Sequence, residues 1–146
     1  MALAADFRYA DSDATLTTGY ARLAASGDLG IGWLLSRLVG RTRTRELLFF
    51  SDRIKGSEAA AIGLVDAALP ADDLAELVQG RARRLAEGPP VAFNYIKRNL
   101  RFADTSTLDD YLEYEAGNMA RCFMTRDCDE AVRAMTERRP PKFEGL

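Results

Sequence analysis

The hydrophobic positions beyond residue 70 recur with the spacing of amphipathic helices. Leu74, Leu77 and Leu85, for example, fall on one face of a helix. The run Gly88-Pro89-Pro90 separates this helix from the next, because proline suits the first turn of a helix but not its interior. The pattern predicts four helices here: over about 72–87, over 90–102, from a cap at 106 or 107 with Met119 on the apolar side, and over about 127–137.

The first 70 residues show a mixed pattern. Short alternating runs at 7–10 and 15–17 indicate strands, and 64–69 is typical of a strand that Pro70 closes. Strands so far apart cannot form a stable sheet by themselves, so either they belong to a larger sheet or the helices alone carry the fold. The helices expected in this part cover 29–39, ended by Gly40, then about 42–50 and 57–62.

Composition and charge restrict the class of protein. A chain of 146 residues with 47% apolar and 29% charged residues is typical of one globular domain with a core. Net charge is −2 with both signs interspersed, which argues against a nucleic-acid partner, and no apolar run approaches the length that a bilayer requires. The first residues do not resemble an export signal, and the two cysteines are expected as reduced thiols. We therefore expect a cytoplasmic protein.

The chain contains no histidine. This absence excludes Ser-His-Asp and Cys-His catalysis and His-containing zinc sites. With only two cysteines, a structural zinc site is not expected either. No metal and no bound cofactor are expected. Any chemistry must use carboxylates, Tyr, Lys, Arg or backbone N–H groups.

Several short motifs resemble, in order and spacing, those of the crotonase (enoyl-CoA hydratase/isomerase) superfamily. The resemblance covers essentially the whole chain, and its strength lies in the ordered combination rather than in any one motif. The motifs are Ala4-x-Asp6-x-Arg8-x-Ala10, Gly27-Asp28-Leu29-Gly30, Leu35-x-Arg37-Leu38-Val39-Gly40, Glu46-Leu47-Leu48, Ala59-x-x-x-Gly63-Leu64-Val65 and Arg138-Arg139-Pro140-x-x-Phe143.

The resemblance implies an α/β fold, namely the C-terminal part of the crotonase ββα superhelix, mostly helical with a few short strands. Residues 1–70 would be a remnant of the crotonase core, and residues 71–146 a helical region for assembly into a homo-trimer or hexamer. In this family two backbone N–H groups hold the thioester oxygen of acyl-CoA, and both would precede this chain. We therefore expect a truncated chain that is inactive by itself.

The resemblance makes Asp28 the candidate catalytic residue. From its position before an apolar helix alone, Asp28 is expected as an N-cap. In crotonase members that isomerise acyl-CoA without hydrating it, an acidic residue at this position serves as base or nucleophile. Facing an apolar acyl pocket, such a carboxylate would be a stronger base because its charged form is poorly solvated.

The residue Tyr20 stands where the hydratase subgroup has one of its two glutamates. A phenol stays protonated near neutral pH, so Tyr20 cannot replace that carboxylate, and hydration is disfavoured. We expect Tyr20 in the substrate pocket as an aromatic with a paired hydroxyl. Trp33 and Leu34 are expected to line the acyl pocket or the core.

The C-terminal residues Arg138, Arg139, Lys142 and Phe143 lie where the family places a cationic and aromatic tail near the adenosine end of coenzyme A, and we expect Arg138, Lys142 and Phe143 to bind it. Arg138 could grip a phosphate, or it could be a solvated charge at a helix end.

Two functions remain open. The first is part of an enzyme of acyl-CoA thioesters, with isomerisation or related enolate chemistry favoured over hydration and with Asp28 as acid/base, or as nucleophile in a hydrolytic variant. The second is a non-catalytic oligomerisation module or an inactive remnant of such an enzyme.

Overall fold

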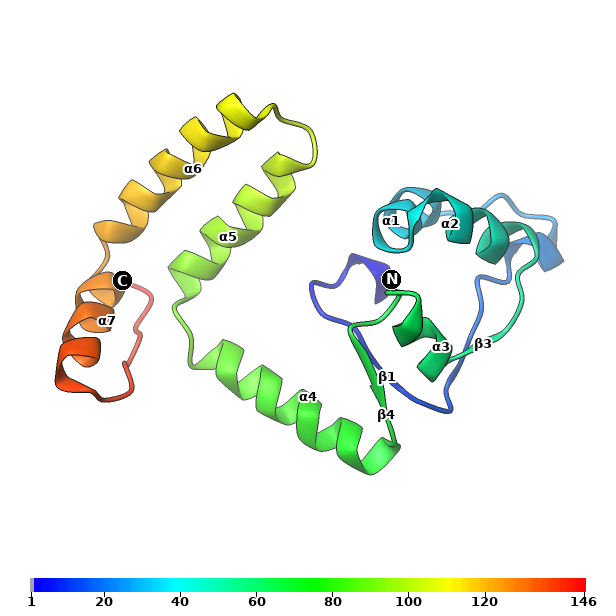
Figure 1. Ribbon diagram of the computed structural model, residues 1–146, viewed down its shortest axis with the longest axis horizontal. Coiled ribbons are helices and arrows are strands. Elements are labelled where there is room, and N and C mark those ends of the chain that lie inside the picture. Colours follow the sequence, from blue (N-terminus) through cyan, green and yellow to red (C-terminus); the bar gives the residue numbers. More distant parts are fainter. Residues whose placement is uncertain (1) are drawn as a thin grey trace. The chain divides into compact units, whose positions relative to one another are not determined.

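The computed structural model describes residues 2–146, and these divide into two compact units, one that ends at Gln79 and one from Gly80 to Leu146. The boundary falls within one helix, α4 (Ala71–Ala86). Residue 1, where the expected core segment 1–70 begins, lies outside the described residues. The roles expected for 1–70 and 71–146 stay predictions, while the mostly helical fold with a few short strands is confirmed (Figure 1).

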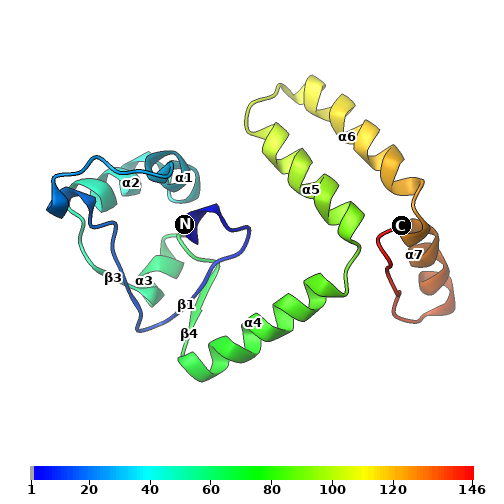
Figure 2. The same cartoon turned by 180° about the vertical axis from the view of Figure 1, so that it is seen from behind.

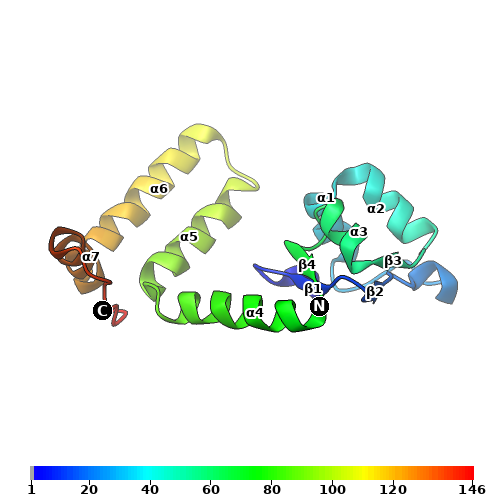
Figure 3. The same cartoon turned by 60° about the horizontal axis from the view of Figure 1, so that its bottom comes forward.

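The first unit combines short helices with two small sheets. Its elements are η1 (Ala2–Ala4), β1 (Tyr9–Asp11), β2 (Thr15–Leu16), η2 (Tyr20–Leu23), α1 (Ile31–Leu38), α2 (Gly40–Phe49), β3 (Ile54–Lys55), α3 (Gly56–Ala61) and β4 (Ala67–Leu69). Strand β1 pairs with β4 in parallel, and β2 pairs with β3 in antiparallel orientation. Among the described residues each sheet therefore has two strands, and helix α3 contacts β1 and β4 (Figure 3).

A close backbone approach joins the two sheets at Gly56. The Gly56 N–H donates to the Ala14 carbonyl at 2.9 Å, directly after the turn between β1 and β2. A β-carbon on Gly56 would lie 1.9 Å from the Asp11 carbonyl oxygen, so a side chain here would push β1 and α3 apart. The sequence does not reveal this constraint, because the contact joins residues that are 45 positions apart.

The core of the first unit is small and aliphatic. Leu35 of α1 is 2% exposed, and it packs with Leu47 of α2 and Ala59 of α3. Ile54, Leu64 and Val65 complete the buried cluster from the segments around β3 and before β4. Leu35, Leu47 and Ala59 each lie on the buried face of their own helix, and the three helices α1, α2 and α3 therefore share one apolar core.

The second unit consists of helices. The end of α4 is followed by α5 (Pro90–Ala103), α6 (Leu108–Phe123) and α7 (Arg126–Glu137). Helices α5 and α6 run antiparallel side by side, and the chain after α7 folds back along that helix (Figures 1 and 2). The Thr107 hydroxyl caps α6 by accepting from the Asp110 N–H, and Thr125 caps α7 by accepting from the Cys128 N–H.

Three sequence expectations need correction. Strand β3 is not predicted by the sequence. The segment 64–69 is a strand only at Ala67–Leu69, and Leu64 and Val65 are buried in a bend before it. Gly40 has the expected left-handed backbone, with a φ of 73°, yet α2 begins there rather than at about residue 42. No helix of the described residues is long and apolar enough to cross a bilayer.

Candidate functional site

The loop between η2 and α1 carries Asp28 in a backbone that few sequences can adopt. Gly27, Leu29 and Gly30 all have positive φ, of 103°, 48° and 74°. For Leu29 the left-handed conformation costs roughly 1–2 kcal/mol because its β-carbon crowds the backbone. Strain of this kind is found next to functional side chains more often than elsewhere.

This loop geometry overturns the expectation that the Asp28 side chain caps the helix. Gly30 is the N-cap residue of α1, and it makes no side-chain cap. The Asp28 carbonyl accepts from the Ile31 N–H at 3.0 Å, so Asp28 contributes its backbone to the helix start. Its carboxylate is thereby left available for another partner.

That partner is Tyr20, the first residue of η2. The Tyr20 hydroxyl donates a hydrogen bond to Oδ1 of Asp28. Gly19, with a φ of 72°, precedes Tyr20 and lets the chain turn into the 3-10 helix. The structure therefore brings together the two polar residues that the sequence singled out separately.

Tyr20 and Asp28 line a pocket of about 300 Å³. The other residues lining it are Leu3, Ala4, Leu29, Ile31 and Leu34. A mostly apolar pocket with one or two convergent polar groups is the usual form of a small-molecule site. This one could receive an apolar chain and present a carboxylate to it.

The hydrogen bond also sets the protonation of Tyr20. Donation to the Asp28 carboxylate raises the pKa of the Tyr20 phenol above its usual 10, and partial burial and the negative charge of Asp28 act in the same direction. Tyr20 therefore stays protonated near neutral pH. It can orient the carboxylate of Asp28 but cannot act as a second base.

Of the two apolar residues expected in the substrate pocket, the structure places one there. Leu34 lines the pocket with Asp28. Trp33 is not among the lining residues, is 54% exposed, and has the Arg37 guanidinium 3.5 Å from its ring centroid. Such a cation–π contact holds the indole on the outer face of α1. A substrate-binding role for Trp33 stays a prediction.

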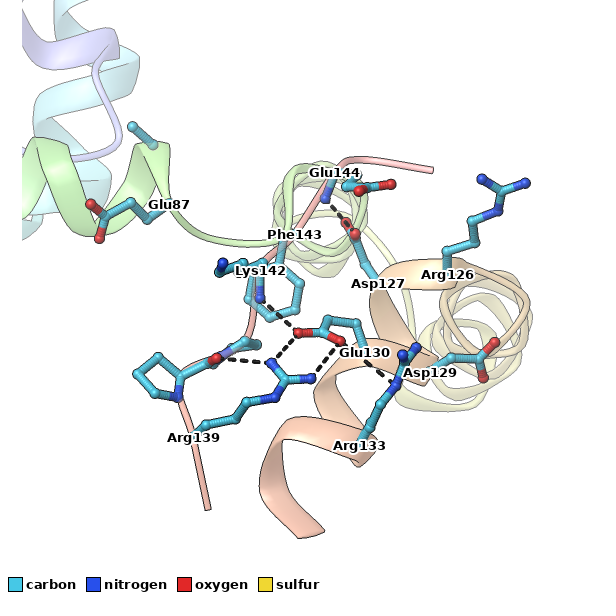
Figure 4. A pocket seen from close by; sticks show the side chains of 13 residues that line it. Glu87, Arg126, Asp127, Asp129, Glu130, Arg133, Arg139, Lys142, Phe143 and Glu144 are labelled. Atoms are coloured by element: carbon cyan, nitrogen blue, oxygen red, sulfur yellow. Dashed lines mark hydrogen bonds and ion pairs between the residues drawn. The ribbon is translucent and has the colours of Figure 1, made fainter. Parts of the chain in front are cut away.

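The candidate coenzyme A residues lie in the second unit, around a pocket of about 1100 Å³ (Figure 4). Lys142 and Phe143 line this pocket, whereas Arg138 does not. Arg138 is the C-cap of α7, with a φ of 54°, and this left-handed residue reverses the chain so that the tail runs back. The roles expected for the three residues stay predictions.

Arg139, a member of the C-terminal motif, binds two carboxylates at this pocket, and the sequence did not predict either contact. Its Nη1 and Nη2 bind the two carboxylate oxygens of Glu130 at 2.5 and 3.0 Å (Figure 4). Its Nε binds Glu137 at 2.5 Å. Glu130 also accepts from the Lys142 N–H at 3.0 Å. These hydrogen bonds from Arg139 and Lys142 hold the pKa of Glu130 at about 2. No local sequence signal marks this pair, because the residues meet only through the reversal at Arg138.

A second carboxylate anchors the end of the described chain. Asp127, which is buried, accepts from the N–H groups of Glu144 and Gly145 at 2.7 and 3.0 Å. The Leu146 carbonyl in turn accepts from the Arg126 N–H at 2.7 Å, at the N-terminus of α7. Among residues 2–146 no three His, Cys, Asp or Glu side chains could hold a metal ion.

Comparison with known proteins places the chain in a family. The sequence model described as "Enoyl-CoA hydratase/isomerase" matches residues 1–146. The chain belongs to the enoyl-CoA hydratase/isomerase family. The resemblance that the ordered motifs suggested is thereby confirmed, and the crotonase fold with it.

Named members of the enoyl-CoA hydratase/isomerase family include both reaction types. A Rhodobacter capsulatus protein named "Probable enoyl-CoA hydratase" is 34% identical over 99% of this chain and 56% of its own. An Escherichia coli K12 protein named "1,2-epoxyphenylacetyl-CoA isomerase" is 30% identical over 99% of this chain and 55% of its own. The crystal structure of an enoyl-CoA hydratase from Bacillus anthracis has a TM-score of 0.93 at 30% identity, over 99% of this chain and 56% of that one.

The chain spans about half the length of these relatives. The covered fraction of each relative gives the extent of the match and not its position in the longer chain. Correspondence to the C-terminal half of these relatives therefore stays a prediction. The subtype likewise stays open, because relatives of similar identity are named for hydration and for isomerisation.

The Tyr20–Asp28 hydrogen bond predicts a change in phenol titration. Asp28→Asn removes the negative charge that disfavours the phenolate, so the pKa of Tyr20 should fall toward 10. The ¹³Cζ resonance of Tyr20, assigned with a Tyr20→Phe variant, measures this pKa without interference from the other tyrosines. Tyr111, which donates to Glu115, serves as internal control and should not change. An unchanged Tyr20 titration would show that the pair is not formed.

The Glu130–Arg139 pair predicts a pH-dependent loss of stability. Its pKa of about 2 lies below the ordinary 4.5, so the stabilisation is present above pH 4.5 and disappears as pH falls toward 2. Glu130→Gln should therefore lower the melting temperature at pH 7 and much less near pH 2. Circular dichroism at both pH values measures the difference, with the exposed Glu113→Gln as control. An equal loss at both pH values would contradict the ion-pair account.

Proposed function

We propose that this chain contributes the acid/base residue of an enzyme that acts on acyl-CoA thioesters, and that the reaction is double-bond isomerisation or related enolate chemistry. The observation that carries the proposal is the Tyr20–Asp28 pair at an otherwise apolar pocket. Membership of the enoyl-CoA hydratase/isomerase family supports acyl-CoA as the substrate class.

The proposed chemistry requires one base that both takes up and returns a proton. The Asp28 carboxylate removes a proton from a carbon of the acyl chain, and the electron pair moves toward the thioester carbonyl to form an enolate. Asp28, now protonated, returns the proton to a different carbon, which shifts the double bond. Atoms and charge balance within the substrate and Asp28, and no water is consumed.

The role of Tyr20 separates this chemistry from hydration. Addition of water in the hydratase subgroup would need two carboxylates, and the resemblance aligns Tyr20 with one of them. The phenol of Tyr20 is a hydrogen-bond donor to Asp28 with a raised pKa, so it cannot activate water as a base. It can hold Asp28 in one orientation, which favours a single-base mechanism. Asp28 could instead act as a nucleophile in the same geometry: attack on the thioester carbonyl would form a mixed anhydride and expel the thiolate of coenzyme A, which water would then hydrolyse.

A second candidate function is assembly without catalysis. The helices of the second unit expose apolar side chains that a monomer would leave in water. These side chains are Ile96, Leu100, Leu112, Met119, Phe123, Met124, Val132 and Met135. Their exposure favours contact with further copies, as in the homo-trimer or hexamer that the family resemblance implies. Assembly is compatible with the enzyme proposal and becomes the sole function only if Asp28 is dispensable.

Kinetics of the longest gene product that contains these residues test the enzyme proposal. We expect conversion of a 3-enoyl-CoA to its conjugated isomer, followed by absorbance of the conjugated thioester, and slower hydration of crotonyl-CoA. Asp28→Asn should lower kcat by about 10²–10⁴-fold, because it removes the base. Asp13→Asn, an exposed acid of the same unit, should leave kcat unchanged.

The contradicting outcome is isomerase activity that survives Asp28→Asn, which would remove Asp28 from the mechanism. Faster hydration than isomerisation would refute the assigned subtype but not the substrate class. For the 146-residue chain alone we expect no turnover of either thioester. Turnover by that chain, abolished by Asp28→Asn, would contradict the view that a further part of the enzyme is required.

A further inference from the structure

The segment that presents Tyr20 has little secondary structure to hold it. It consists of the two-residue strand β2, a connection through Gly19 and the four-residue helix η2. The first N–H groups of η2 have no side-chain cap from the residue before it. What fixes this segment must therefore come from elsewhere in the chain.

Ser51, directly after the C-cap of α2, supplies the contacts. Its side chain is fully buried, and its φ of 51° is a left-handed conformation that a serine adopts at a cost. The Ser51 Oγ accepts from the Ala21 N–H at 3.3 Å and lies 3.1 Å from the Thr18 Oγ1. The Ser51 carbonyl accepts from the Thr17 hydroxyl at 2.9 Å.

The same network completes the C-terminus of α2, whose last carbonyls lack helical partners. The Thr18 hydroxyl donates to the Leu47 carbonyl at 2.6 Å, and the Ser51 hydroxyl can donate to the Leu48 carbonyl at 3.3 Å. Each hydroxyl has one proton to donate and lone pairs that accept. The Thr18 proton goes to the Leu47 carbonyl, and the Ser51 oxygen can accept from the Ala21 N–H while its own proton points to the Leu48 carbonyl. Ser51 thus joins the end of α2 to the start of η2.

From these contacts we propose that Ser51 is a positioning residue for Asp28. It holds residues 17–21 against the end of α2, and this fixes Tyr20, whose hydroxyl orients the Asp28 carboxylate. Ser51 is not one of the residues lining the Tyr20–Asp28 pocket, so it acts through the backbone of Ala21 rather than on a substrate. That this positioning matters for catalysis rests on the proposed function, whereas the positioning of Tyr20 by Ser51 is independent of it.

Ser51→Gly is the sharpest test, because it removes Oγ while glycine accepts the left-handed backbone without strain. The fold should therefore survive. In the 146-residue chain we expect faster hydrogen exchange at the Ala21 N–H. We also expect the Tyr20 ¹³Cζ titration to move in the same direction as in Asp28→Asn. Thr18→Val, which removes the neighbouring hydroxyl, should give the same signature more weakly.

Thr44→Val is the matched control, because Thr44 is a buried hydroxyl on the same helix that donates to the Gly40 carbonyl at 2.8 Å. It should change neither the Ala21 exchange nor the Tyr20 titration. Wild-type values of both in Ser51→Gly would overturn the proposal. No acyl-CoA enters the measurement, so the result is independent of whether Asp28 proves to be catalytic.

Discussion

The hydrogen bond between Tyr20 and Asp28 sets the constraint on which the candidate site depends. It joins Tyr20, the first residue of the short helix η2, to Asp28 in the loop before α1, and this segment has little secondary structure of its own. Glycines or left-handed residues occur at both ends of the segment, and Leu29 accepts strain beside Asp28. Such a loop keeps one conformation only if contacts outside it determine its backbone, and the hydroxyls of Thr17, Thr18 and Ser51 make those contacts.

The Tyr20–Asp28 pair lines a pocket whose other residues are apolar. The rest of the lining is aliphatic, and the Tyr20 hydroxyl is a protein hydrogen-bond donor that orients the Asp28 carboxylate, which is itself exposed to solvent. The phenol remains a donor because its hydrogen bond to Asp28, together with partial burial and the negative charge of Asp28, raises the pKa of Tyr20. One carboxylate with one neutral donor is suited to moving a proton between two carbons, which is the basis of the function proposed above.

Much of the helical architecture could be predicted from sequence because its signals are local. The breaks at Gly88-Pro89-Pro90 and the cap at Thr107 mark α5 and α6 closely. The site could be predicted only in part. The family resemblance pointed to Asp28 and Tyr20 separately, but it did not predict the hydrogen bond between them. That contact requires successive left-handed residues, which made the N-cap expectation for Asp28 wrong. The Glu130–Arg139 pair and the Ser51 contacts depend on chain reversals that no short window of sequence encodes.

The proposed site requires that the acyl group of the substrate contact Tyr20 and Asp28 together. Titration of the longest gene product with butyryl-CoA, followed at Tyr20 ¹³Cζ and Asp28 ¹³Cγ, tests it most directly. The account predicts that both resonances shift along one binding curve, and that coenzyme A without an acyl group leaves them in place. Failure of butyryl-CoA to bind, or binding that moves neither resonance, would contradict it.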